Sequence, residues 1–313
     1  MTVLVTGADG FVGRWVVRAL VAAGHAVVAA AGPGATPPAD LAALGGVRWV
    51  SLDLRDPVSV AALAGERCDA VLHLAGLASG AEALRDPALA WEVNAAGTAR
   101  LLEALGRRRA AGDGDPRVVV VSTAEVYGPC GRALTEADPV RPVSPYAASK
   151  AGMELAARET AARTGLRVVT ARPFPHTGPG QDDRFVTAAF ARRLAAARQL
   201  RARVVKVGNL EVTRDLLDVR DVADAYLALL SAGTPGEAYN IASGTGVRLR
   251  ELFDRLAGVL GVDAIPETDA TLVRPHDVPF LVGDASKLRA ATGWAPRIPL
   301  DRTLREIVDA QAR

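Results

Sequence analysis

The sequence predicts an α/β protein built on a doubly wound parallel sheet, with a smaller C-terminal substrate-binding lobe. Six apolar, strand-like runs alternate with helical patterns: "TVLVTG" (2–7), "HAVVAAA" (25–31), "VRWVSLDL" (47–54), "AVLHLAG" (70–76), "RVVVVST" (117–123) and "RVVTARPF" (167–174). Continuous apolar strands separated by amphipathic helices are typical of a parallel sheet that is covered on both faces. Beyond Pro173 the alternation gives way to loops, a basic helix (186–203), a strand pair around "VKVGN" and "RDLLDV", and a proline-rich tail.

Composition limits the class of protein. The 313 residues are 50% hydrophobic and carry a formal charge of +2, with scattered arginines, so nothing indicates nucleic-acid binding. Two cysteines, Cys68 and Cys130, and four separated histidines predict neither a disulfide framework nor a metal site. No signal peptide and no uninterrupted apolar run of membrane-spanning length is visible, so we expect a cytoplasmic protein without a membrane partner.

The first strand-like run ends in a glycine-rich turn, "TGADGFVG". Glycines at this spacing let the backbone approach a pyrophosphate, which lies at the positive N-terminus of the following helix. A tight strand-to-helix turn alone requires glycine too, but the position after the first strand of a parallel sheet favours the dinucleotide-binding (Rossmann) interpretation. We assign the cofactor contacts of this turn to Gly7, Gly10, Phe11, Val12, Gly13 and Arg14.

Further cofactor contacts are expected where the later strands end. Asp53, followed by Leu54, closes the third strand, and its carboxylate is placed to accept a hydrogen bond from an adenine amino group. The alternative is that Asp53 caps a helix, a role for which Asp56 is better placed. "HLAG" ends the fourth strand at the same edge, and we expect its His73 to be packed in the core. The other expected cofactor contacts are Leu74, Ala75, Gly76 and, later in the chain, His176.

The second strand ends without an acidic residue. A carboxylate there normally binds the adenosine ribose and rejects a 2′-phosphate, but the chain reads Ala30, Ala31, Gly32. Arg14 lies just beyond the glycine turn, where it can meet a phosphate. The sequence therefore favours NADPH, with NAD as the alternative.

The stretch "SPYAASKAGMELAARE" (144–159) places a phenol and an amine four residues apart on a predicted helix. Ser144 suits the N-cap and Pro145 the first turn, so the helix should begin beside Tyr146. Residues at this spacing share one helical face, which brings the Lys150 ammonium near the phenol. The same spacing recurs on many solvated helices, so the pair needs support from other motifs.

That support comes from "VVVVSTAEVYG", which places the Thr123 hydroxyl at the carboxyl edge of the sheet. Together the three side chains predict a hydride-transfer site. Thr123 orients a carbonyl, Tyr146 exchanges a proton with its oxygen, and Lys150 holds the nicotinamide ribose. We expect the amine and an oxidised nicotinamide to lower the pKa of the phenol.

Four motifs together resemble the extended short-chain dehydrogenase/reductase family, or NAD-dependent epimerase/dehydratase family: "TGADGFVG", "WEVNAAGT" (91–98), "STAEVYG" (122–128) and "YAASK" (146–150). Within that family, the segments 172–181, 207–222 and 274–288 resemble GDP-sugar enzymes, above all the GDP-4-keto-6-deoxy-D-mannose reductases. The resemblance implies a GDP-hexose substrate whose diphosphate is gripped by Arg214 and Arg274, with Asn209, Thr123 and Glu125 as further contacts. It also implies a homodimer formed through helices 88–106 and 146–163.

Two departures from the related enzymes bear on the substrate. GDP-mannose 4,6-dehydratases are longer and read "RDW" where this chain has Leu216 after Asp215, which favours a reductase. Pro175 stands where both kinds of enzyme have an asparagine that contacts the sugar nucleotide, and proline offers neither an amide side chain nor an N–H.

The predicted function is NAD(P)H-dependent reduction of a nucleotide-linked 4-keto-6-deoxyhexose. A dehydratase is the first alternative, because Glu125 matches the carboxylate that removes the C5 proton in those enzymes. An epimerase that retains NAD and a non-catalytic dinucleotide-binding regulator are the others. We expect residues 1–171 and 214–232 to form the dinucleotide-binding domain and residues 172–213 and 233–313 the substrate-binding lobe.

Overall fold

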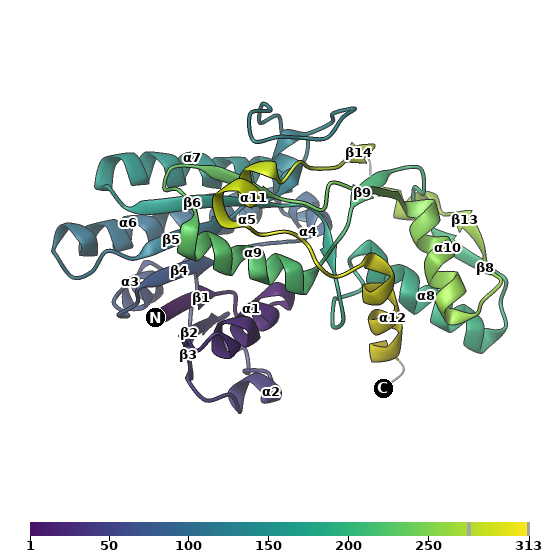
Figure 1. Cartoon of the computed structure of the whole chain (residues 1–313), viewed down its shortest axis with the longest axis horizontal. Helices are drawn as coiled ribbons and strands as arrows, with labels where there is room; N and C mark the ends of the chain where they lie inside the picture. The colour runs from purple at the N-terminus through teal and green to yellow at the C-terminus, as the bar shows by residue number, and fades with distance from the viewer. Residues whose placement is uncertain (274–276, 312–313) are drawn as a thin grey trace.

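A parallel sheet of seven strands dominates the computed structural model, which describes residues 1–273 and 277–311 (Figure 1). The strand order is β11-β6-β5-β4-β1-β2-β3, and each neighbouring pair is parallel. The strands are β1 (Thr2–Thr6), β2 (Ala26–Ala31), β3 (Val47–Ser51), β4 (Ala70–His73), β5 (Arg117–Val121), β6 (Arg167–Pro173) and β11 (Ala238–Ile241). The doubly wound fold predicted from the sequence is confirmed.

Side chains that alternate along the strands build a core on each face of the sheet. Val3 and Val5 pack on one face, where the covering helices are α1 (Phe11–Ala22), α9 (Val219–Ala232) and α11 (Ser286–Thr292), with α2 (Ala39–Ala42) beside α1. Leu4 packs on the other face beneath α3 (Pro57–Ala64), α6 (Thr98–Ala110) and α7 (Pro145–Thr164). Because both faces are covered, most of the strand residues are apolar, which is why the strands were recognisable in the sequence.

A continuous helical segment was expected over residues 88–106, but the structure divides it. After α4 (Gly80–Arg85), the short helix α5 (Pro87–Ala90) leads into a π-helical segment, η1 (Trp91–Gly97), and then into α6. The widened turn frees the carbonyl of Asn94, which accepts a hydrogen bond from the Thr98 hydroxyl at 2.7 Å. Such π segments are frequent at functional sites.

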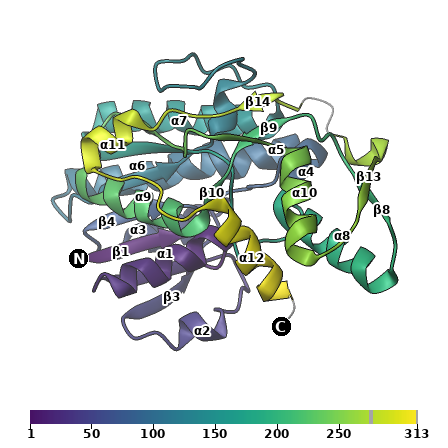
Figure 2. The same cartoon turned by 45° about the vertical axis from the view of Figure 1, so that its right-hand side comes forward.

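The smaller lobe lies beyond the carboxyl edge of the sheet, on the right in Figure 1 and nearer the viewer in Figure 2. Its core is formed by α8 (Val186–Leu200), α10 (Leu249–Leu260) and α12 (Leu300–Gln311). Strands are present around both "VKVGN" and "RDLLDV", but they do not pair with each other; Leu210 and Val212, between them, pack into this core. Later segments supply the partners: β8 (Val204–Val207) pairs with β13 (Ile265–Thr268), and β9 (Thr213–Asp215) pairs with β12 (Gly246–Arg248) and β14 (Phe280–Leu281).

The predicted domain boundaries need correction at residues 214 and 233. Arg214 was assigned to the dinucleotide-binding domain but belongs to β9, which pairs with β12 and β14, and α11 was assigned to the smaller lobe but packs on the large core. Residues 233–313 were assigned to the smaller lobe, yet β11 extends the large sheet beside β6, with Tyr239 opposite Ala171. Its apolar residues Tyr239 and Ile241 belong to the large core, which explains why the strand joins that sheet.

The remaining elements are β7 (His176–Thr177), β10 (Leu217–Asp218) and the 3-10 helices η2 (Ala124–Tyr127) and η3 (Ala270–Leu272). Among the described residues, no helix is both long and apolar enough to span a membrane.

Candidate active site

The glycine turn brings helix α1 into contact with the end of β1. A Cβ atom on Gly13 would lie 2.1 Å from the Gly7 carbonyl oxygen and 2.7 Å from the Ala8 Cα, so no larger residue fits. Gly7 itself has a φ of 68°, a conformation that L-residues rarely adopt. The turn therefore holds the N-terminus of α1 at the carboxyl edge of the sheet, in the arrangement that binds a pyrophosphate.

Asp53 lies at the same edge, but with a partner that the sequence did not reveal. Its carboxylate accepts hydrogen bonds from Arg55 Nε at 3.0 Å and Nη2 at 2.9 Å, and these bonds lower the pKa of Asp53. Asp56 is the N-cap of α3, accepting from the Val58 N–H at 2.9 Å, so the alternative role considered for Asp53 is excluded. The adenosine end of the expected site therefore carries an arginine as well as a carboxylate.

Helix α7, which carries Tyr146 and Lys150, begins as predicted. Ser144 caps α7 by accepting a hydrogen bond from the Ala147 N–H at 3.1 Å, and Pro145 is its first residue. One turn later, the buried Lys150 donates from Nζ to the Val121 carbonyl oxygen at 2.8 Å, which ties the helix to the end of β5. Burial lowers the pKa of Lys150 to about 8.

Tyr146 lies against Thr123 and Glu125, but the predicted direction of its pKa is wrong. Burial, followed by the negative charge of Glu125, raises the pKa of the phenol, while the hydrogen bond with the Thr123 hydroxyl opposes this. Only 8% of Tyr146 is exposed, so the loss of water strongly disfavours the phenolate. The phenol keeps its proton at neutral pH and is suited to act as an acid.

Asn94 in η1 is a site residue that our sequence reasoning did not identify, although its motif was noted. Its side chain accepts from the Leu77 N–H at 2.8 Å and donates to the Leu77 carbonyl at 3.1 Å and to Ser149 Oγ at 2.9 Å. A Cβ atom on Gly76 would lie 2.7 Å from Asn94 Oδ1 and 3.3 Å from Lys150 Nζ. Asn94 therefore joins the turn after β4 to helix α7 beside Lys150.

His73 is buried, as expected, and is part of a directed hydrogen-bond chain. The Ala75 N–H donates to Thr6 Oγ1 at 3.0 Å, and Thr6 Oγ1 lies 2.8 Å from His73 Nδ1. His73 Nε2 lies 2.8 Å from Thr98 Oγ1. Because the Thr98 hydroxyl donates its own proton to the Asn94 carbonyl, it can only accept from His73, so Nε2 carries the ring proton and donates. Burial and the charge of Lys150 lower the pKa of His73 to about 3, which keeps the ring neutral.

Two residues expected to contact the sugar nucleotide, Asn209 and Arg214, and one expected to contact the cofactor, His176, lie in the segment that follows β6. Arg214 donates from Nη1 to the Val278 carbonyl at 2.7 Å and forms an ion pair with Asp277. Asn209 accepts from the Glu211 N–H at 2.9 Å within a turn, and Arg274 lies outside the described residues. His176 Nδ1 lies 3.0 Å from the Phe174 carbonyl oxygen, and burial lowers its pKa.

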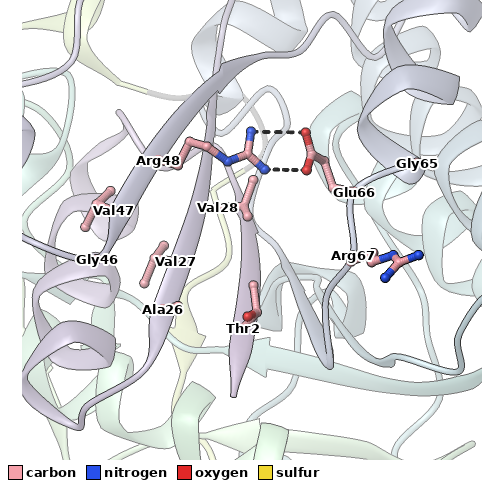
Figure 3. A pocket seen from close by; sticks show the side chains of 10 residues that line it. All are labelled: Thr2, Ala26, Val27, Val28, Gly46, Val47, Arg48, Gly65, Glu66 and Arg67. Carbon is pink, nitrogen blue, oxygen red and sulfur yellow. Dashed lines mark hydrogen bonds and ion pairs between the residues drawn. The ribbon is translucent and has the colours of Figure 1, made fainter.

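A pocket lies at the opposite, amino edge of the sheet, and Figure 3 shows the residues that line it. It is lined by the first residues of β1, β2 and β3 and by the turn around Gly65, and it is crossed by an ion pair between Arg48 and Glu66. Parallel sheets bind ligands at their carboxyl edge, so we assign no catalytic role to this pocket.

Comparison with known proteins now identifies the class. The family model described as GDP-mannose 4,6 dehydratase matches residues 4–307, and the chain belongs to that family, within the extended short-chain dehydrogenase/reductases. It is 38% identical to GDP-6-deoxy-D-mannose reductase of Pseudomonas aeruginosa, over 97% of this chain and 95% of the relative. The expectation of an extended short-chain oxidoreductase acting on nucleotide sugars is confirmed.

Two solved structures extend this comparison. The structure of RMD from Pseudomonas aeruginosa, complexed with NADPH, superposes with a TM-score of 0.82 at 36% identity, covering 99% of this chain and 98% of the other. UDP-glucose 4-epimerase of Thermus thermophilus, in complex with NAD, superposes with a TM-score of 0.86 at 33% identity, again covering 99% and 98%. Relatives with this fold thus bind either dinucleotide.

Proposed function

We propose that this protein reduces GDP-4-keto-6-deoxy-D-mannose to a GDP-6-deoxyhexose, with NADPH as the hydride donor. The observation that carries the proposal is the meeting of Thr123, Tyr146 and Lys150 at the carboxyl edge of the sheet, with a phenol that keeps its proton. The similarity to GDP-6-deoxy-D-mannose reductase over nearly the whole chain supports the choice of substrate.

The residues present fit a dinucleotide. The close contact of Gly13 with Gly7 and Ala8, which no Cβ atom could enter, holds the N-terminus of α1 against the end of β1, where a pyrophosphate would bind. The residues that would hold the pyrophosphate are Gly7, Gly10, Phe11, Val12 and Arg14, and those that would contact the rest of the cofactor are Leu54, Leu74, Ala75, Gly76 and His176. The bound nicotinamide supplies the hydride for C4 of the sugar.

The chain's own residues manage the proton and the carbonyl. Thr123 and Tyr146 donate hydrogen bonds to the C4 oxygen, which polarises the carbonyl and fixes its orientation. As hydride adds to C4, the oxygen gains negative charge and takes the proton of Tyr146, so a C–H and an O–H bond form. Lys150 holds the ribose hydroxyls and stabilises the phenolate that is left until it is reprotonated from solvent.

The preference for NADPH rests on charge. No carboxylate lies at Ala30, Ala31 and Gly32, and the carboxylate of Asp53 is held by Arg55. Arg14 donates from Nε to the Asp9 carbonyl oxygen at 2.8 Å, which leaves its guanidinium charge close to the start of α1. The NADPH complex of the Pseudomonas structure supports the same choice.

We also propose a cytoplasmic homodimer. Leu84, Trp91 and Leu155, from α4, η1 and α7, have 53%, 46% and 63% of their surface exposed. Apolar side chains gathered on neighbouring helices suit a helix-to-helix interface. The two free cysteines, Cys68 and Cys130, support a reducing compartment. Sedimentation at micromolar concentration should give the mass of a dimer, and a monomer would contradict the interface.

A 4,6-dehydratase is the second candidate, and Glu125 is the observation that favours it. Its charge acts directly on Tyr146, so a carboxylate is present beside the expected C4 and C5 of the sugar. A dehydratase or an epimerase returns the hydride within each turnover, whereas a reductase releases an oxidised cofactor.

The test is an absorbance assay with purified protein. We expect NADPH, and more slowly NADH, to be oxidised when GDP-4-keto-6-deoxy-D-mannose is added. If NADPH absorbance stays flat while GDP-mannose alone is converted to a 4-keto product, the dehydratase is the correct function. Cofactor binding without turnover on either substrate would favour a non-catalytic regulator.

A further inference from the structure

Two residues of the sequence motifs have no role in the mechanism above. Tyr127 is the tyrosine of "STAEVYG" and Arg172 opens "RPFPHTGPGQ", and both are buried, with 3% and 4% of their surface exposed. Arg172 donates from Nη1 to the Tyr127 hydroxyl at 2.9 Å, and its guanidinium carbon lies 4.8 Å from the centre of the Tyr127 ring. Two residues far apart in sequence thus form one buried contact beneath the site.

The same guanidinium forms a two-point ion pair with helix α7. Arg172 donates from Nε to Glu154 Oε1 at 3.0 Å and from Nη2 to Glu154 Oε2 at 2.6 Å, and only 4% and 6% of the two side chains are exposed. Glu154 follows Lys150 by four residues on α7, so it lies on the same face of the helix.

Hydrogen bonds extend this cluster to the edge of the sheet. The Tyr127 hydroxyl donates to Asn240 Oδ1 at 2.6 Å, and Asn240 Nδ2 donates to the Leu134 carbonyl at 3.0 Å. Tyr127 ends η2, the short helix that Thr123 caps through the Glu125 N–H at 3.2 Å. The cluster therefore fixes η2, β6, β11 and α7 relative to one another, and with them Thr123 and Lys150.

Lys150 is surrounded by groups of different charge. His73 on β4 is neutral, the Tyr146 phenol on α7 is protonated, and Glu125 on η2 acts on Tyr146. Glu154 opposes the effect of burial by raising the pKa of Lys150, and its partner Arg172 adds a second buried positive charge. The core thus contains a row of three charges, in which the negative Glu154 lies between the positive Lys150 and Arg172.

We propose that Glu154 and Arg172 are positioning residues for the amine of Lys150: the ion pair anchors α7 to β6, and the Glu154 carboxylate lies on the same helical face as the ammonium, one turn away, where it balances the buried charge. A buried ion pair is weak evidence for stability, because apolar residues of similar volume often serve as well. Because Glu154 lies one turn from Lys150, we assign the ion pair a role in positioning Lys150 rather than in stability. The proposal rests on the proposed function, since it concerns the amine that would hold the nicotinamide ribose.

The sequence offers a direct readout, because it contains three lysines only: Lys150, Lys206 and Lys287. In protein labelled with ¹³C at the lysine ε-carbons, NMR titration gives one curve for each. Lys206 and Lys287 are half-exposed and paired with Glu267 and Glu237, so they serve as internal references. Lys150→Met assigns the remaining signal.

Two substitutions should move that signal in opposite directions. Glu154→Gln leaves two buried cations close together, so the pKa of Lys150 should fall by about one unit or more. Arg172→Gln leaves an unpaired carboxylate next to Lys150, so its pKa should rise by a similar amount. The double variant, which removes both charges, should return close to the wild-type value. Glu159→Gln, on the exposed part of the same helix, should change nothing.

Simple loosening of the structure would not give shifts of opposite sign. As the pH is raised, kcat should decrease once the Lys150 ammonium loses its proton. In the Glu154→Gln protein this decrease should begin at a lower pH than in the wild type. Shifts of the same sign, or no shift in a folded variant, would overturn the proposal. If one variant does not fold, the other decides alone. The titration needs no substrate, so it remains decisive even if the wild-type protein fails to reduce the 4-keto sugar.

Discussion

The two ends of the candidate site are held in different ways. At the carboxyl edge of the large sheet, close backbone contact and buried hydrogen bonds position the residues: Gly13 against Gly7, and Lys150 against the Val121 carbonyl. In the smaller lobe, Arg214 is held by a side chain, Asp277, from a segment far away in the sequence. The first arrangement restricts which residue types are possible, whereas the second depends on a pairing that only the fold reveals.

The largest effect should come from breaking the backbone contact of the first region. Gly13→Val would force the Cβ atom into the Gly7 carbonyl, 2.1 Å away, and push α1 off β1. We expect NADPH affinity to fall at least about 100-fold, or ~2.7 kcal/mol. Gly258→Ala in α10, where a Cβ meets nothing within 4 Å, is the control and should bind normally. NADPH fluorescence measures the affinity of both variants, and thermal unfolding shows whether they are folded. Retained affinity in a folded Gly13→Val protein would refute the placement of the pyrophosphate at this turn.

Removal of the acid should have the largest effect on turnover. Tyr146→Phe keeps the ring and deletes the proton donor, so kcat should fall by about 10²–10⁴ with little change in NADPH or substrate binding. Tyr239→Phe, which loses a hydroxyl that only accepts the Thr234 N–H at 3.1 Å, is the matched control. Steady-state rates together with equilibrium binding separate the two effects. Near-normal turnover in Tyr146→Phe would show that another group supplies the proton.

A change in the second region should affect substrate affinity alone. Arg214→Lys keeps the charge but loses the fork that contacts Val278 and Asp277, so we expect the KM for the sugar nucleotide to rise about tenfold. NADPH affinity should be unchanged. Arg250→Lys, whose partner Asp254 is on the surface, controls for a general effect of the substitution. A lower NADPH affinity in Arg214→Lys would mean that the two regions are not independent.

The smallest effect on rate is expected for Glu125→Gln. A reductase needs no base at C5, so kcat should fall less than about tenfold, whereas a dehydratase would lose the contribution of a general base, about 10²–10⁴. Because Glu125 raises the pKa of Tyr146, its neutralisation should lower that pKa. The sequence contains four tyrosines, so NMR of labelled tyrosine can follow the Tyr146 signal. A near-complete stop of turnover would favour the dehydratase.

What could be predicted from the sequence follows the same division. The strands, the glycine turn and the start of α7 were predictable, because apolar strands, Gly13 and Ser144 each satisfy a local requirement of the backbone. The pairing of β8 with β13 was not, because it joins segments separated by the whole of α10.

Electrostatics were the least predictable part of the site. The spacing of Tyr146 and Lys150 indicated a lowered phenol pKa, but the spacing contains no information on burial, which reverses the direction. The partners Arg55 and Asp277 were missed for a related reason. Each binds its residue through side-chain geometry that no motif specifies.

The central claim is net transfer of hydride from the cofactor to a sugar carbonyl, and isotope transfer tests it most directly. NADPH carrying deuterium in both positions at nicotinamide C4 should be incubated with GDP-4-keto-6-deoxy-D-mannose, and the product examined by mass spectrometry and NMR. We expect one deuterium at C4 of the GDP-6-deoxyhexose and one oxidised cofactor for each product formed. A product without deuterium, or no oxidised cofactor while GDP-mannose is converted to a 4-keto sugar, would contradict the account.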